Sequence, residues 1–197
     1  MNQKLINILA IAYSLFMLIL AIIFYKSNES FKFLISLSGV FCGVIPLILA
    51  FILKFKSNIQ LVFFYIVFLF CSQYLGSIRG WYGLGWWDIF LHFISGILIA
   101  YLGVAIYERL ILRTAGKMIS KWFVFLFIFA FSVFGGVLWE FYEFSMDQIF
   151  EMTLQGGGNK DTMIDLIADT TGGLVIALWS VLKLKLKYKN EDKYLHS

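Results

Sequence analysis

The chain has 197 residues, of which 61% are hydrophobic and only 14% are charged, with a formal net charge of +4. A soluble domain carries about 25% charged residues, so this composition excludes an ordinary soluble protein. The basic residues lie in short loops between apolar runs, where they determine membrane topology and do not indicate nucleic-acid binding. We therefore expect a single integral membrane domain over 1–197, with membrane lipids as its surroundings and no nucleic-acid partner.

Six apolar segments follow one another along the chain, each close to or above the ~20 residues that a helix needs to cross a bilayer. Only helices suit such segments, because a backbone in lipid must satisfy its own hydrogen bonds. We predict an all-α polytopic bundle, followed by a basic cytoplasmic tail at 183–197. The predicted membrane helices are 5–25, 33–53, 59–76, 88–107, 121–148 and 162–182.

The loop charges predict the orientation of this bundle. With six spans, the two termini and the second and fourth loops share one side, which carries twelve Lys and Arg residues. The other side carries four, namely Lys26, Lys32, Arg79 and Lys160. Because positively charged loops stay in the cytoplasm, both termini are predicted to be cytoplasmic.

The third loop, at 76–88, is predicted to lie on the outer side and is rich in aromatic residues. Rings of this kind are typical of the belt at the membrane–water interface. Arg79 in this loop offers a forked donor to a phosphate. Together with Lys160 in the fifth loop, it is our candidate for substrate binding.

Acidic residues gather at the outer ends of the last three predicted helices. Eight of the twelve in the chain lie there: Asp88, Glu140, Glu143, Asp147, Glu151, Asp161, Asp165 and Asp169. Residues three or four positions apart are neighbours on a helix surface. The spacings therefore predict one polar stripe per helix: Asp88 with His92; Glu140, Glu143 and Asp147; and Asp161, Asp165 and Asp169. We expect the three stripes to face one another.

The stripes reach about 10–12 Å below the helix ends at ~1.5 Å per residue. A carboxylate deep in lipid costs roughly 2.5–3.5 kcal/mol on insertion scales, so these groups should face an internal wet or ion-filled cavity. Carboxylates with few imidazoles suit hard cations such as Mg²⁺, Mn²⁺ or Ca²⁺. We predict Glu140, Asp161, Asp165 and Asp169 as ligands of a divalent cation.

His92 is the histidine of the membrane part, since His196 lies in the tail. It stands one turn from Asp88, which can orient its ring. His92 is therefore a candidate general base, with Asp88 and Glu143 as the other catalytic candidates. The same residues also suit interfacial carboxylates at helix N-termini, a structural polar network, or a cation pathway.

Paired glycines predict a close approach of the last two helices. Gly135-Gly136 and Gly172-Gly173 lie at similar depths below the outer helix ends. Small residues allow membrane helices to approach closely, so these helices should meet just under the acidic stripes.

Three motifs carry a family resemblance. The run Trp87-Asp88-Ile-Phe-Leu-His92-Phe-Ile-Ser-Gly96 resembles the Asp-x-x-x-His-x-x-x-Gly signature of YjdF-like bacterial membrane proteins. Residues 139–143 and 161–172 resemble the second and third signatures of that family. The resemblance covers most of 81–177 and implies a multi-pass protein of the bacterial cytoplasmic membrane, without implying a reaction.

A more distant similarity is to VanZ-like proteins, which are linked to glycopeptide tolerance at the cell envelope. This chain departs from their pattern, because Asp169 stands where an Asn is expected and no Arg precedes Asp161.

The acidic spacing of the last predicted helix, Asp-x-x-x-Asp, is also used by membrane phosphotransferases that hold Mg²⁺ against a pyrophosphate. We therefore predict an outward-facing carboxylate and histidine site that binds a divalent cation and acts on a lipid or lipid-linked phosphate. The sequence leaves open a proton- or cation-coupled small transporter and a non-catalytic envelope or scaffold protein. It also leaves open whether the protein is an enzyme and whether it forms a homo-oligomer.

Overall fold

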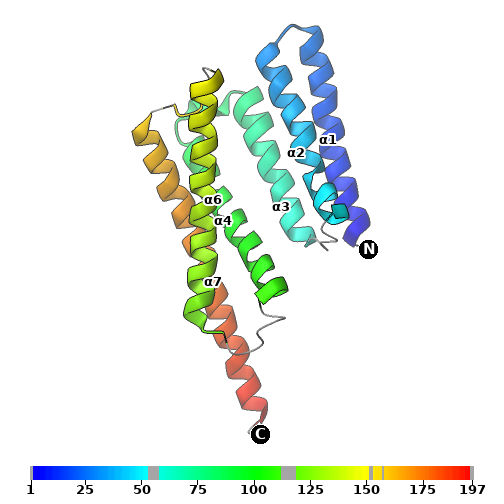
Figure 1. Cartoon of the computed structure of the whole chain (residues 1–197). Coiled ribbons are helices and arrows are strands. Elements are labelled where there is room, and N and C mark those ends of the chain that lie inside the picture. Colours follow the sequence, from blue (N-terminus) through cyan, green and yellow to red (C-terminus); the bar gives the residue numbers. More distant parts are fainter. Residues whose placement is uncertain (1, 53–57, 112–118, 151–152, 157, 196–197) are drawn as a thin grey trace. The chain divides into compact units, whose positions relative to one another are not determined.

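The structure is a computed structural model that describes residues 2–52, 58–111, 119–150, 153–156 and 158–195. Every regular element in this part of the chain is helical, and six helices are long and apolar enough to cross a membrane (Figure 1). The prediction of an all-α chain with six spans is confirmed. No residue of the described part forms a strand.

The helices follow the predicted segments closely, with differences at their ends. They are α1 (Asn2–Lys26), α2 (Ser30–Ile52), α3 (Ile59–Leu69), η1 (Phe70–Ile78), η2 (Trp81–Leu84), α4 (Trp87–Ile106), η3 (Tyr107–Ile111), α6 (Lys121–Phe150) and α7 (Asn159–Leu195). The third span continues from α3 into the wider π-helical turns of η1. The last helix runs through most of the predicted tail, where Lys and Leu, both good helix formers, are common.

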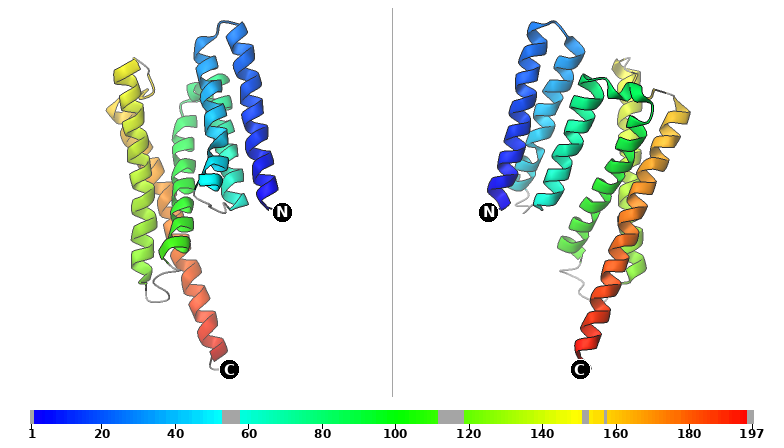
Figure 2. Two further views of the ribbon diagram at one scale, coloured as in Figure 1. Left: turned by 45° about the vertical axis from the view of Figure 1, so that its right-hand side comes forward. Right: turned by 180° about the vertical axis from the view of Figure 1, so that it is seen from behind.

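Contacts divide the chain into two compact units, Met1–Leu91 and His92–Ser197. In the first unit, α1 and α2 lie side by side and are joined by a short turn (Figure 2). Their apolar core includes Tyr13 and Met17 of α1. The Tyr13 hydroxyl donates a hydrogen bond of 2.6 Å to Gln73 in η1, so a polar contact within the membrane part ties α1 to the third span.

The second unit contains α6, α7 and α4 from His92 onward. Helices α6 and α7 lie alongside each other (Figure 2). A cluster of buried residues fills the core between the helices of this unit: Ala100, Tyr107, Val124, Ile128 and Ala177. The boundary between the units falls in the first turns of α4, which is one continuous helix. Asp88 is therefore carried on the same element as His92.

Candidate functional site

Glycines allow the backbones of α4 and α7 to touch. Gly96 of α4 lies against the carbonyl group of Asp169, and Gly172 of α7 lies against the carbonyl group of Phe93. A side-chain carbon at either glycine would overlap the facing oxygen. Small residues permit this kind of approach between membrane helices. The contact sets the depth at which the polar side chains of the two helices meet.

The same mode of packing brings α6 against α7. A side-chain carbon at Gly136 would lie 2.9 Å from a carboxylate oxygen of Asp169. Gly173 lies against the hydroxyl of Ser132, which donates a hydrogen bond of 2.8 Å to the carbonyl oxygen of Gly96. The predicted close approach of the last two helices is confirmed, and it extends to α4.

His92 is held in one orientation by Asp169. The imidazole is 4% exposed, and its Nδ1 lies 3.0 Å from Oδ2 of Asp169, which is 1% exposed. Since an ionised carboxylate only accepts hydrogen bonds, Nδ1 carries the proton and donates it. The Ser95 hydroxyl bonds to the other Asp169 oxygen and lies 2.8 Å from the carbonyl oxygen of His92. In the neutral imidazole, Nε2 is then left with a lone pair.

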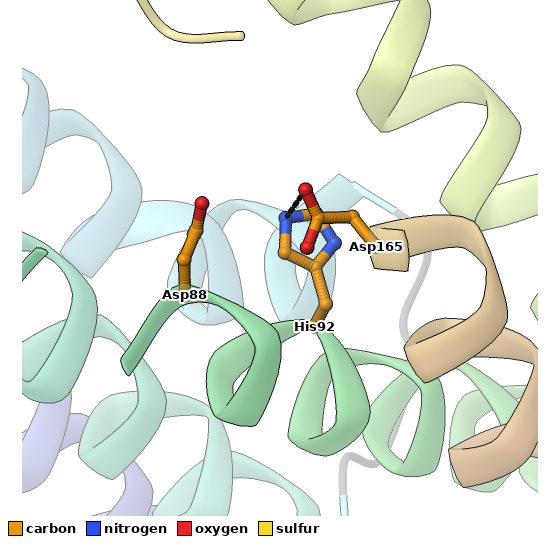
Figure 3. Close-up of side chains that lie close together, drawn as sticks. All are labelled: Asp88, His92 and Asp165. Carbon is orange, nitrogen blue, oxygen red and sulfur yellow. Dashed lines mark ion pairs between the residues drawn. The ribbon is translucent and has the colours of Figure 1, made fainter. Parts of the chain in front are cut away.

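That second nitrogen is turned toward another buried carboxylate. Nε2 of His92 lies 4.0 Å from Oδ2 of Asp165, which is 1% exposed. Figure 3 shows Asp165 reaching from α7 to the imidazole, with Asp88 one turn earlier on α4. One ligand atom from each of Asp88, His92 and Asp165 lies within 4.8 Å of the other two. Metal-binding histidines commonly have their second ring nitrogen hydrogen-bonded to a carboxylate. Here Nδ1 of His92 is bonded to Asp169, and two other carboxylates lie near the ring.

The acidic stripe of α6 divides between different tasks. Glu140 is 4% exposed, and neither of its oxygens has a hydrogen-bond partner of normal geometry among the described residues. Its charge lies close enough to interact with His92 and Asp169. Glu143 is also buried, and one of its oxygens accepts a hydrogen bond of 2.9 Å from the indole of Trp139 on the same helix.

Asp147, the third member of that stripe, holds a loop. Its two oxygens accept hydrogen bonds from the backbone N–H groups of Leu154 and Gln155, at 2.7 and 3.0 Å. The Gln155 side chain in turn donates to the Thr162 hydroxyl at 2.8 Å, at the start of α7. Asp147 therefore stabilises the connection between α6 and α7. Glu151 lies outside the described residues.

Three further predicted residues do not belong to the group of close ligand atoms. Asp161 is half-buried in the first turn of α7, with an oxygen near the backbone of Gly156. Lys160 is exposed in the same turn, and Arg79 is exposed at the end of η1 in the first unit. Their roles as ligand and substrate contacts remain predictions.

Sequence reasoning missed Ser95, which holds the carboxylate that orients His92. Ser95 follows His92 by three residues and so shares its helix face. This spacing was the available signal, although serines at such positions are common in membrane helices that carry no site.

Residues 8–185 match the model of a family described as "Predicted membrane protein (DUF2238)", and the chain belongs to this family. An "Uncharacterized protein" of Thermotoga maritima is 30% identical over 109 residues, which are 55% of this chain and 55% of that protein. The chain thus spans about half the length of this curated relative. No solved structure matches the chain. The resemblance to YjdF-like and VanZ-like proteins remains a prediction.

Proposed function

We propose that this member of the DUF2238 family binds a divalent cation between α4 and α7 and uses it on the phosphate of a lipid or lipid-linked substrate. The ligands are Nε2 of His92 and one oxygen each from Asp165 and Asp88. One observation carries the proposal: Asp169 fixes the His92 ring at Nδ1, which turns Nε2 toward the buried carboxylate of Asp165. This arrangement is typical of histidines that bind metals.

Charge supports a cation at this position. His92 contacts the buried carboxylates of both Asp165 and Asp169. Two buried carboxylates beside one imidazole repel each other, and this repulsion favours a cation between them. A divalent cation bound at Nε2 neutralises Asp165 and Asp88 and leaves Asp169 to orient the ring.

The dimensions favour a hard ion that retains water. Adjacent ligands of Mg²⁺ lie about 3 Å apart, since its ligand distances are about 2.0–2.1 Å in an octahedron. The 4.0 Å between His92 Nε2 and Asp165 Oδ2 is wider than this, so cation binding requires the two side chains to rotate toward each other. Three protein ligands leave about three octahedral positions for water and substrate oxygens.

Depth supports a lipid substrate. His92 follows the start of α4 by five residues, and Asp165 follows the start of α7 by six. At ~1.5 Å per residue, these side chains lie roughly 8–9 Å below the helix ends. This depth is close to the level of the lipid headgroups, so a lipid phosphate can enter the site from the bilayer. We propose that the site faces outward, with both termini in the cytoplasm of a bacterium, and that Arg79 and Lys160 contact the phosphate.

The structure favours this proposal over a transporter. A pathway across the membrane would have to continue past the glycine contacts into the cluster around Ala100, Ile128 and Ala177. No carboxylate belongs to that cluster of described residues. A scaffold protein needs no such preorganised histidine, although it would tolerate one.

Metal content tests the proposal most directly. We expect purified wild-type protein to bind one equivalent of Mn²⁺, and Asp165→Asn to weaken binding at least tenfold. Asp147→Asn is the matched control, because Asp147 binds backbone groups of a loop, and it should retain wild-type affinity. Wild-type protein that binds no divalent ion would refute the proposal. Proton flux in liposomes that disappears in Glu143→Gln would favour the transporter instead.

Substrate and orientation need separate experiments. Phosphorus-containing lipids are compared between cells that express wild-type protein and cells that express Asp165→Asn. An identical lipid profile would exclude a lipid phosphate as the substrate in those cells. Reporter fusions at the C-terminus and within the loop near Arg79 should report the cytoplasm and the outside, respectively.

A further inference from the structure

Glu140 is a buried carboxylate for which the helices supply no hydrogen-bond donor of normal geometry in the described part of the chain. It is 4% exposed, and both oxygens are fully covered. On the next turn of α6, Glu143 accepts a hydrogen bond from an indole. A buried carboxylate with too few hydrogen bonds is costly, and among the described residues only Thr162 approaches Glu140 as a hydrogen-bonding side chain, outside normal geometry. Glu140 therefore has room for a further partner.

The helix face on which Glu140 lies is directed at the candidate site. Gly136 stands four residues earlier on α6 and abuts the carboxylate of Asp169. Residues four positions apart share a helix face. Glu140 is also close enough for its charge to interact with His92, Asp169 and Asp161, and the Thr162 side chain reaches it with a hydrogen bond outside normal geometry. The partner of Glu140 therefore lies on the side of α6 that faces the site.

Direct ligation by Glu140 is not the arrangement that these distances favour. The ligand atoms within 4.8 Å of one another come from Asp88, His92 and Asp165, and Glu140 is not among them. A water bound to Mg²⁺ at about 2.1 Å can donate a hydrogen bond of about 2.6 Å to a carboxylate oxygen. That oxygen can then lie up to roughly 4.7 Å from the ion. Mg²⁺ and Mn²⁺ retain such waters, whereas structural Zn²⁺ sites are closed by four protein ligands.

We infer that Glu140 is an outer ligand of the cation: it accepts a hydrogen bond from a metal-bound water and positions that water beside His92. The inference rests on the proposed function and extends it, because it specifies a partly hydrated hard cation as the occupant. It also gives Glu140 a role different from the direct ligation that the sequence predicts. The water held by Glu140 lies where a substrate phosphate would meet the cation.

The experiment uses Mn²⁺ as the probe with full-length protein in nanodiscs. Wild type, Glu140→Gln and Asp147→Asn are compared by electron paramagnetic resonance for affinity and by water-proton relaxation for bound water. Loss of an outer-shell partner typically weakens metal binding about 10–100-fold, which is the result expected for Glu140→Gln. Asp147→Asn should stay within about twofold of wild type, since the Asp147 carboxylate binds backbone N–H groups of the loop after α6.

Two further readouts separate this role from a structural one. Glu140→Gln removes a buried charge that lacks a hydrogen bond of normal geometry among the described residues, so the metal-free variant should melt at or above the wild-type temperature while its stabilisation by Mn²⁺ falls. A lower relaxation enhancement should accompany the lower affinity. If Glu140→Gln does not fold, Glu140→Asp is measured instead, and its shorter carboxylate should also weaken Mn²⁺ binding.

The outcomes distinguish the two proposals. Wild-type protein without Mn²⁺ affinity refutes the proposed function and removes the basis of this inference. If wild-type protein binds Mn²⁺ and Glu140→Gln binds it with unchanged affinity, only the role of Glu140 is refuted. The same holds for Glu140→Asp where that variant is measured instead. Equal losses in Glu140→Gln and Asp147→Asn also refute it, because general damage to α6 would then be the cause.

Discussion

Replacing Asp169 by asparagine should preserve the fold although it removes a buried charge at the centre of the site. In the structure, the Asp169 carboxylate accepts from His92 Nδ1 and from the Ser95 hydroxyl. The single proton of Ser95 is shared between that carboxylate and the carbonyl oxygen of His92. An asparagine at this position can accept from His92 with its oxygen and donate to Ser95 with its amide. Ser95 then gives its proton wholly to the carbonyl, so the His92 N–H and the Ser95 hydroxyl both stay paired.

Alanine at the same position cannot do this. Asp169→Ala leaves the imidazole N–H of His92 buried without an acceptor, which costs about 1–3 kcal/mol. For a chain of this size, 1 kcal/mol corresponds to about 2–4 °C in melting temperature, so the loss is roughly 2–12 °C. Asp169→Asn should stay within about 1 kcal/mol of wild type, since its hydrogen bonds are conserved. Both variants lose the same negative charge, so the difference between their free energies of unfolding measures the contribution of the hydrogen bonds.

The assay is thermal unfolding in detergent, followed by helical circular dichroism, with and without Mn²⁺. In the metal-free state, we expect wild type and Asp169→Asn to have similar melting temperatures, both higher than that of Asp169→Ala. With Mn²⁺, the stabilisation should be smaller in Asp169→Asn than in wild type, because the outer-shell charge that makes His92 a better ligand is gone.

Equal destabilisation by asparagine and alanine would refute the hydrogen-bond geometry described for His92 and Ser95. Wild-type stability in Asp169→Ala would show that the His92 N–H finds another acceptor. Either result would remove the orientation argument on which the assignment of Nε2 as a ligand depends.

Three other predictions concern the packing around the site and the first unit. Gly172→Ala places a methyl group against the α4 backbone and should cost about 1–3 kcal/mol by overpacking, whereas Gly83→Ala, whose new carbon meets nothing within 4 Å, should leave the melting temperature unchanged. Asp147→Ala frees two backbone N–H groups and should increase proteolysis between α6 and α7, with wild-type cleavage as the contrary result. A double-mutant cycle on Tyr13→Phe and Gln73→Leu should give a coupling of about 0.6–1.7 kcal/mol, and a value near zero would contradict the bond between them.

Much of the fold is readable from local sequence properties. Apolar runs of membrane-spanning length predict the helices, because hydrophobicity and backbone satisfaction in lipid depend on each segment by itself. The π-helical turns of η1 and the extension of α7 to Leu195 are not predicted. The first depends on how the third span packs, and the second continues past the last apolar run.

The stripes of acidic residues are likewise a local property, since the helical period alone places Glu140 and Glu143, or Asp165 and Asp169, on related faces. The sequence therefore determined which residues share a helix surface, and it identified His92 as their natural partner. It could not determine which carboxylate meets which donor, because residues three or four positions apart differ in direction by only about 40–60°.

Only the tertiary structure decided those pairings. Contacts at Gly96 and Gly172 set the rotation and the depth of α4 against α7, and these place Asp169 at His92 Nδ1 and Asp165 beyond Nε2. The same packing leaves Glu140 buried with no donor of normal geometry among the described residues. Such pairings depend on where separate helices cross, and this is determined by backbone contacts between residues that are far apart in the sequence.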